Sequence, residues 1–299
     1  MTTPRRVLPG ITYLVTRRCS ERRCFLRPSA ATNEIFLFVL AMAARRYRVA
    51  VHAVCVLSNH YHVLVTDPHA LLPAFVQYLD ALVARAVNAS LGRWEGFWSA
   101  GTSFSAVSNA SPADVVHKAA YLIANPVAAG LVERGEDWPG IRTSPEQIGG
   151  AILTAQRPSG FFRENGSMPE SVELELTVPP GFASLQEFRA EVAAETRALE
   201  ASARRAIVAA GRRFLGRSRA LAQSPSSRPA TGELRRGLNP RVAARNPSRR
   251  VEALARLEEF VRRYRAALAS LRAGVRDVVF PAGTYRLRVE LGVCCEAPG

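Results

Sequence analysis

Two histidines separated by a single residue are the first feature of this 299-residue sequence that points to chemistry. His60 and His62 open the segment HYHVLVT, whose β-branched and aromatic residues predict a strand. Because side chains two apart on a strand project from the same face, the two imidazoles are expected to lie side by side. Such a pair either binds one divalent metal ion or forms ordinary half-buried hydrogen bonds.

A second feature is Tyr121, which lies on a predicted helix that begins at Ser111. Serine as N-cap followed by Pro112 is typical of a helix start, and Pro126 is expected to end the helix at about Asn125. At about 100° per residue, the apolar side chains cluster on one arc. His117, Tyr121 and Asn125, each four residues apart, line up on the opposite arc. Tyr121 is therefore either a displayed nucleophile or a residue at the solvent edge.

Together the two features describe a reaction at phosphorus. A metal ion on His60 and His62 polarises a phosphodiester, and the phenol of Tyr121 attacks it in line to leave a phosphotyrosine. This transesterification requires no nucleotide cofactor. Mg²⁺ and Mn²⁺ prefer oxygen ligands, and imidazole ligation alone equally favours Zn²⁺, so Asn125 and the phosphate oxygens would have to favour the harder ions.

The elements around these residues predict an α+β fold. Strands are expected at 13–19, 49–57, 60–66 and, more weakly and at an edge, 96–107, with helices at 32–48, 71–91 and 111–125. Thr32 is the expected N-cap of the first helix, and Ser58-Asn59 forms a tight turn between two strands. The order β-α-β-β-α-β-α predicts a ferredoxin-like antiparallel sheet with helices on one side.

The remainder of the chain is predicted to be mostly helical. A proline- and glycine-punctuated stretch at 140–180 looks like a linker with short strands near 172–178, and long helices are expected at 184–210 and 251–273. A terminal hairpin is expected at 275–289. The sequence is 48% hydrophobic, which supports a packed core, and its apolar runs are too short to cross a bilayer. Five cysteines without a CxxC pair fit a reducing cytosol, so a cytoplasmic protein with no membrane contact is expected.

Positive charge is concentrated in the last third of the chain. Of the 40 basic residues only Lys118 is a lysine, and the formal net charge is +15. Residues 1–200 hold 19 basic and 18 acidic side chains, whereas residues 201–299 hold 21 and 7. Such an arginine-dense segment is either a binding surface for a phosphate backbone or a solvated basic face.

Two stretches resemble a known family, the single-tyrosine HUH transposases, and within them the REP-associated tyrosine transposases. LSNHYHVLV at 57–65 is similar to the family's MPNHVHLLV, and YLIANPVAAGLV at 121–132 is similar to YIxxNPVRAGLV. The continuation EDWP at 136–139 and the opening PGITYLVTRR at 9–18 also look like the family. The resemblance covers about residues 1–145. Leu57, Ser58, Tyr61 and Ala128 depart from the family pattern, and Ala128 stands where the family has an arginine.

The resemblance implies an HUH nuclease core in which Tyr121 is the nucleophile. It implies His60, His62 and Asn125 as ligands of Mg²⁺ or Mn²⁺. The expected activity is that of a transposase or nickase that cleaves single-stranded DNA beside a hairpin and rejoins strands through a 5′-phosphotyrosine. Tyr61 points away from both histidines and is not the expected nucleophile, and His117 belongs to no family motif.

Three hypotheses follow, together with a division of the chain. The enzyme is the leading one, the second is a domesticated, non-catalytic protein that binds hairpin DNA or RNA, and the third is a structural zinc site at His60 and His62.

The expected parts are a transposase domain at 1–145, a linker at 146–182 and a basic accessory region at 183–299 that adds DNA binding. The expected partner is single-stranded or hairpin DNA, and the expected assembly is a monomer or a homodimer.

Overall fold

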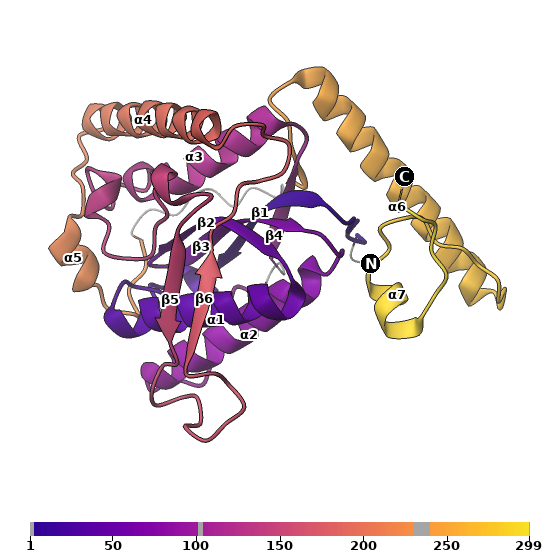
Figure 1. Ribbon diagram of the computed structural model, residues 1–299, viewed down its shortest axis with the longest axis horizontal. Coiled ribbons are helices and arrows are strands. Elements are labelled where there is room, and N and C mark those ends of the chain that lie inside the picture. Colours follow the sequence, from indigo (N-terminus) through magenta and orange to yellow (C-terminus); the bar gives the residue numbers. More distant parts are fainter. Residues whose placement is uncertain (1–2, 101–103, 230–239, 299) are drawn as a thin grey trace.

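A five-stranded sheet with helices on both faces forms the centre of the molecule (Figure 1). The computed structural model describes residues 3–100, 104–229 and 240–298. The strands are β1 Ile11–Arg18, β2 Ala50–Leu57, β3 His60–Asp67, β4 Ser105–Asn109, β5 Ile152–Gln156, β6 Ser171–Glu175 and β7 Val242–Ala243. The helices are α1 Ala30–Tyr47, α2 Leu72–Ser90, α3 Pro112–Ala128, α4 Leu185–Ala209, α5 Arg217–Leu221, α6 Pro247–Arg272 and α7 Arg286–Leu291. The α+β class and the order of the first seven elements are confirmed.

The sheet has the strand order β2-β3-β1-β4-β7. β1 pairs antiparallel with both β3 and β4, and the β2–β3 hairpin closes at Leu57 and His60 around the predicted Ser58-Asn59 turn. The strand expected at 96–107 is the shorter β4; part of that range, 101–103, lies outside the described residues. It is not at the edge, because β7 pairs with it in parallel and makes the sheet mixed.

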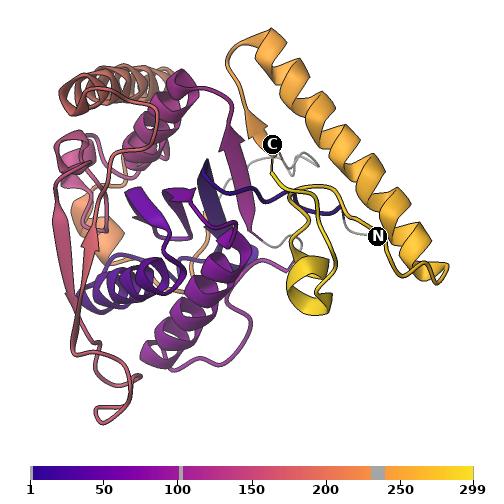
Figure 2. The same ribbon diagram turned by 45° about the vertical axis from the view of Figure 1, so that its right-hand side comes forward.

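The two faces of the sheet carry different helices (Figure 2). Tyr61, Val63 and Val65 of β3 are buried in one cluster with the side chains of α1 and α2. Leu64 faces the other way and packs in a second cluster with α3 and α4. The expectation that the helices lie on one side is therefore wrong for α3 and α4. Because side chains alternate along a strand, His60 and His62 share the face of Leu64 and look toward α3.

Local capping and a proline set the bounds of the helices. α1 begins two residues before the predicted N-cap Thr32, because Ser29 is the N-cap and its hydroxyl accepts the backbone N–H of Thr32 at 3.1 Å. α3 begins as predicted, with the Ser111 hydroxyl accepting the N–H of Asp114 at 3.3 Å. It does not end at Pro126, since the Ala129 N–H donates to the Asn125 carbonyl at 2.8 Å and continues the helix past the proline. Asn125 consequently lies inside the helix, where its side chain has a fixed direction.

The chain after residue 145 is built onto the first part of the fold. β5 and β6 form a hairpin within the predicted linker, and its side chains Ala155 and Leu174 are buried in the cluster that contains α1. α4, predicted at 184–210, lies along α3 and buries Phe188 and Val192 in the second cluster. The division into three parts stays a prediction.

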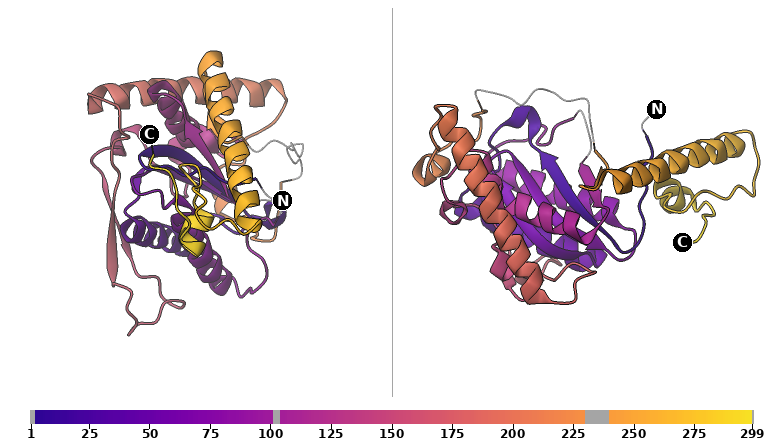
Figure 3. Two further views of the ribbon diagram at one scale, coloured as in Figure 1. Left: turned by 90° about the vertical axis from the view of Figure 1, so that its right-hand side faces the viewer. Right: turned by 90° about the horizontal axis from the view of Figure 1, so that it is seen from above.

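The last elements project from the body (Figure 3). Phe260 is the one buried side chain described in α6. The hairpin expected at 275–289 is wrong: α7 occupies part of that range, and the chain returns through a bridge between Phe280 and Cys295. No helix in the described ranges has both the length and the apolar character needed to cross a membrane.

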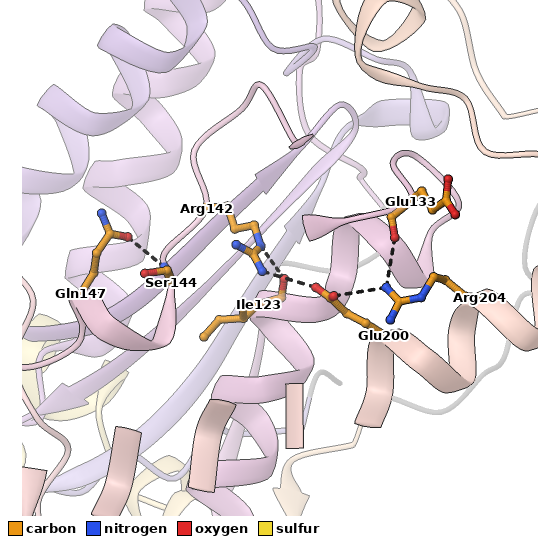
Figure 4. Close-up of polar contacts among 7 residues, drawn as sticks. All are labelled: Ile123, Glu133, Arg142, Ser144, Gln147, Glu200 and Arg204. Atoms are coloured by element: carbon orange, nitrogen blue, oxygen red, sulfur yellow. Dashed lines mark hydrogen bonds and ion pairs between the residues drawn. The ribbon is translucent and has the colours of Figure 1, made fainter. Parts of the chain in front are cut away.

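A polar network fixes α3 against α4 (Figure 4), and its Arg142 also forms a backbone bridge to Cys55 of β2. The Arg142 side chain donates through Nε to the Ile123 carbonyl of α3 at 2.8 Å and forms an ion pair with Glu200 of α4 at 3.4 Å. Arg204 pairs with the same carboxylate and donates to the Glu133 carbonyl at 3.1 Å. Both Arg142 and Glu200 are only 13% exposed, so water screens this bridge little. The helix that carries Tyr121 is thereby held from two directions.

The Tyr61 side chain lies on the face of the sheet opposite to His60 and His62, as its position between them requires. The ring is fully buried, and its hydroxyl donates to Asp80 of α2 at 2.7 Å. Arg17 of β1 lies 3.4 Å from the same carboxylate, and the Trp98 indole N–H donates to the Asp80 carbonyl at 2.9 Å. Burial raises the pKa of Asp80 to about 7, although the Tyr61 hydrogen bond and the Arg17 charge oppose the rise.

This raised pKa predicts a pH-dependent stability difference between the protein and the variant Asp80→Asn. The folded state keeps the Asp80 proton up to about pH 7, whereas the unfolded chain releases it near pH 4. Between these values the folded state binds more protons, so the contribution of this group to the free energy of unfolding falls as the pH rises. From pH 4 to 7 we expect Asp80→Asn to gain roughly 2–4 kcal/mol relative to the unsubstituted protein, measured by urea unfolding. The exposed Asp277→Asn is the control, and a difference for Asp80→Asn that does not change with pH would contradict the assignment.

Candidate active site

Strand β3 presents His60 and His62 side by side on the face covered by α3. Their ring centroids are 4.9 Å apart, with the rings perpendicular. His62 is 3% exposed, whereas His60, at the start of the strand, is partly open to solvent. The predicted same-face arrangement is what the strand geometry produces.

Hydrogen bonds at the inner nitrogen of each ring fix which nitrogen carries the proton. The Asn59 Oδ1 atom can only accept, so the Nδ1 atom of His60, 2.7 Å away, donates to it. In His62 the Nε2 atom accepts from the Asn125 side-chain N–H at 3.1 Å, which leaves the proton on Nδ1. That Nδ1 lies 2.7 Å from the Thr16 hydroxyl, on the residue that pairs with His62 across β1 and β3. Both rings are therefore unprotonated at Nε2, and in His62 this atom accepts the Asn125 N–H.

Helix α3 brings Asn125 and Tyr121 to these rings. Asn125 is 6% exposed and meets His62 directly. One turn earlier, the Tyr121 ring stands edge-on to the His62 ring with centroids 5.5 Å apart. Tyr121 is 39% exposed, so solvent and a bound strand can reach it. A partly open phenol beside a buried imidazole is a workable arrangement for a nucleophile.

The local charge keeps His62 neutral. Burial lowers the pKa of His62 well below its ordinary value, and the electrostatic influence of His60, Arg18 and Lys118 acts in the same direction. The Lys118 ammonium lies 5.5 Å from the centre of the Tyr121 ring, and burial lowers the pKa of this lysine as well. The Asp114 carboxylate, one turn earlier on α3, opposes this lowering of the lysine pKa, although the two side chains form no ion pair in the described part of the chain. The site thus combines neutral metal-binding nitrogens with a half-buried cation.

His117 has a different partner. Its Nδ1 atom lies 2.8 Å from a carboxylate oxygen of Glu195 in α4, and Arg245 reaches the same oxygen at 3.3 Å. The backbone N–H of Arg245 in turn donates to Asp114 in the first turn of α3 at 2.8 Å. His117 therefore helps join α3 to α4 and to the segment before α6.

The donor set suits a cation held by two imidazoles and one amide. Within the described ranges, no group of three or more histidine, cysteine or carboxylate side chains is arranged to hold a metal ion. The Nε2 atoms of His60 and His62 are unprotonated, and that of His62 accepts the Asn125 N–H. A cation bound to His62 would displace this N–H, and the Asn125 amide oxygen could then act as a further ligand. A fully enclosed structural zinc site would need further ligands that these residues do not supply.

The structure brings together all four side chains singled out from the sequence: His60, His62, Tyr121 and Asn125. Their chemical roles stay a prediction. Sequence reasoning missed Thr16 and Asn59 as the partners that orient the rings, and Thr16 gave no signal because its role depends on strand register. It also gave no role to Lys118, although a single lysine three residues before Tyr121 was a visible signal.

A pocket of about 180 Å³ opens beside His60. Its walls come from the end of β1, the β2–β3 turn, the end of α3 and a segment near residue 223. The lining residues are Arg18, Arg22, Cys24, Leu57, Ser58, Asn59, His60, Ala129, Leu131, Gln223 and Pro229. The candidate site thus continues into a cavity with both apolar and cationic walls.

Comparisons with known proteins place the chain beside two solved structures. No family model matches the sequence, and no curated protein matches it. The structure of a REP-associated tyrosine transposase bound to a REP hairpin matches at 20% identity and a TM-score of 0.40, over 47% of this chain and 81% of that one. A protein from Deinococcus radiodurans R1, described as a candidate transposase, matches at 19% identity and a TM-score of 0.28, over 36% of this chain and 85% of its own.

Proposed function

We propose that the protein is a metal-dependent single-stranded DNA transposase or nickase that acts through a 5′-phosphotyrosine intermediate. The observation that carries the proposal is the convergence of Tyr121 and Asn125 from α3 on the His60–His62 pair of β3, with the Tyr121 ring 5.5 Å from that of His62. The two sequence motifs that resemble REP-associated tyrosine transposases supply the same four residues in the same order.

In this proposal the Tyr121 oxygen attacks the phosphorus of one phosphodiester in line. The bond between phosphorus and the 3′ oxygen breaks, and a bond between phosphorus and the tyrosine oxygen forms. The phenol proton is lost and the departing 3′ oxygen gains one, so the step consumes neither a proton nor a nucleotide. Because one phosphodiester replaces another, a 3′ hydroxyl can later attack the phosphotyrosine and rejoin the strands.

His60, His62 and Asn125 are the proposed ligands of Mg²⁺ or Mn²⁺. Such a cation would withdraw electron density from the scissile phosphate and so make the phosphorus easier to attack. Thr16 and Asn59 keep the Nε2 atoms of the two rings unprotonated and aimed at the ligand. The low pKa of His62 keeps that ring neutral and able to bind a metal ion.

The proposed partner is single-stranded or hairpin DNA, and the arginine-rich accessory region is proposed to bind its backbone. In α6, part of that region, Arg256, Arg262 and Arg263 form ion pairs with glutamates and are partly neutralised. Residues 201–299 still hold 21 basic against 7 acidic side chains, and this net positive charge favours binding of a polyanion. All four proposed site residues belong to one chain, so the arrangement supports an active site that a monomer can complete.

The adduct predicted by this proposal can be detected directly. With Mg²⁺ or Mn²⁺, a pool of 3′-labelled hairpin oligonucleotides with randomised single-stranded flanks should give a denaturation-resistant protein–DNA adduct. Tyr121→Phe should abolish it, because no other oxygen replaces the phenol, and chelation of the metal should do the same. Tyr61→Phe is the matched control: its hydroxyl lies under the sheet, so the adduct should persist although loss of the Asp80 contact lowers stability.

A different pattern of results would favour the second hypothesis. Tight binding of the hairpin pool without any adduct in the unsubstituted protein would identify a non-catalytic hairpin-binding protein. An adduct that survives Tyr121→Phe would show that another residue is the nucleophile.

Lys118 is predicted to act on the reacting phosphate rather than on DNA affinity. Its half-buried ammonium lies beside Tyr121 and forms no ion pair with the described side chains, although the charge of Asp114 acts on it, so it can offset charge that develops on the phosphate. Lys118→Met should lower the single-turnover rate of adduct formation by about 100-fold at saturating DNA, with the dissociation constant changed less than about threefold. Lys118→Arg, which retains the charge but not the compact ammonium, should recover part of the rate.

The control for charge is Arg219→Met, which removes one exposed cation from α5. It should weaken binding slightly and leave the rate constant unchanged. If Lys118→Met only weakens binding, as this control does, the lysine has no role in the chemical step.

A further inference from the structure

The pocket beside His60 is completed by a segment that lies outside the region of family resemblance. We call residues 215–229 the C-terminal strap. The backbone N–H groups of Leu215 and Gly216 donate to the carbonyls of Gly130 and Leu131 just after α3, each at 2.9 Å. At its other end the Ser227 carbonyl accepts the N–H of Cys24 at 2.9 Å. These bonds hold the strap across the end of the sheet where His60 lies.

Gln223 is the side chain that the strap contributes to the pocket. Its Oε1 atom accepts the hydroxyl of Ser58 at 2.5 Å, which fixes the orientation of the amide. The Nε2 group has no hydrogen-bond partner in the described part of the chain, so two amide N–H donors remain for a ligand. Ser58 itself is 4% exposed and held in the tight turn, so it is a rigid support.

The other walls suit a nucleotide. Ala129, Leu131 and Pro229 offer apolar surface on which a flat ring can pack, and Arg18 and Arg22 place positive charge at the pocket. A volume of about 180 Å³ accommodates one purine or pyrimidine. Apolar walls with a few fixed polar groups are typical of small-ligand sites, and a base with its phosphate matches both kinds of wall.

A chain of hydrogen bonds connects this pocket to the proposed metal ligand. The Arg22 carbonyl accepts the Asn59 side-chain N–H at 3.2 Å, and Asn59 Oδ1 accepts His60 Nδ1 at 2.7 Å. Glu21 and Arg22 both have positive φ, 50° and 58°, a conformation that non-glycine residues adopt at a cost. The strained turn therefore places the pocket wall and orients His60 through a single side chain, Asn59.

We propose that this pocket binds the base of a nucleotide next to the scissile phosphate, and that the Gln223 amide selects which base is accepted. The inference rests on the proposed function for the position of the scissile phosphate. Beyond that function, we infer that the C-terminal strap is part of the substrate site. The amide donors of Gln223 select a base that presents an acceptor, so specificity at one position depends on a residue far in sequence from His60 and Tyr121.

Selection from a randomised pool tests this directly. Hairpin oligonucleotides with randomised single-stranded flanks are selected in two ways: for adducts with the unsubstituted chain, and for binding to the Tyr121→Phe protein, which needs no chemistry. In both, one flank position should show a base preference of about 5- to 150-fold. Gln223→Ala should remove the preference at that position only. Gln223→Glu keeps the acceptor for Ser58 but replaces the donor, so the preference should move to a base that presents a donor.

The control is Gln77→Ala, an exposed glutamine on α2 at the opposite face, which should leave every preference unchanged. If the binding selection shows a preference that depends on Gln223 but the adduct selection yields no adducts, the proposed function is refuted and the pocket assignment stands. Adducts of Gln223→Ala and Gln223→Glu that show the same base preferences as the unsubstituted chain would overturn the pocket assignment. The absence of any positional preference in either selection would overturn it as well.

Discussion

The bond between Asn125 and His62 joins the two halves of the candidate site, and the other features depend on it. His62 belongs to a central strand of the sheet and Asn125 to the helix packed on that face, with 3.1 Å between Nδ2 and Nε2. This contact requires α3 to lie at one height and one rotation on the sheet. Apolar packing under α3, the Arg142–Glu200 bridge and the His117–Glu195 contact all favour that placement. Tyr121 then reaches the His62 ring because it is one turn away on the same helix.

Along β3, side chains alternate between the two faces of the sheet, so the candidate site residues and a stabilising contact lie on opposite faces. His60 and His62 leave β3 on the face of α3, whereas Tyr61 between them is fully buried on the other face and bonded to Asp80. A shift of the strand register by one residue would exchange the two sets, placing two imidazoles in the apolar core and a phenol in the site. The β1–β3 pairing, which sets Thr16 opposite His62, therefore matters for the site as well as for the fold.

Local sequence signals predicted the elements of the core but not the contacts that orient the site. The HxH spacing, the Ser111 cap and the four-residue spacing of Tyr121 and Asn125 depend on neighbouring residues, and each predicted feature is present. The pairing of β7 with β4, the packing of α4 on α3 and the strap at Gln223 join residues about 60 to 170 positions apart, for which periodicity carries no signal. The prediction that Pro126 ends the helix is wrong. Proline removes only one N–H donor, and the Asn125 carbonyl accepts the N–H of Ala129, so the helix continues.

The central claim is that His60 and His62 together hold a divalent cation beside Tyr121. Pulsed electron paramagnetic resonance of Mn²⁺ bound to protein labelled with ¹⁵N-histidine measures this directly, because each coordinating imidazole nitrogen couples to the metal. Two such couplings are predicted, with one lost in His60→Ala and the other in His62→Ala. Bound Mn²⁺ that shows no histidine coupling, or that binds equally well when both histidines are replaced, would contradict the account.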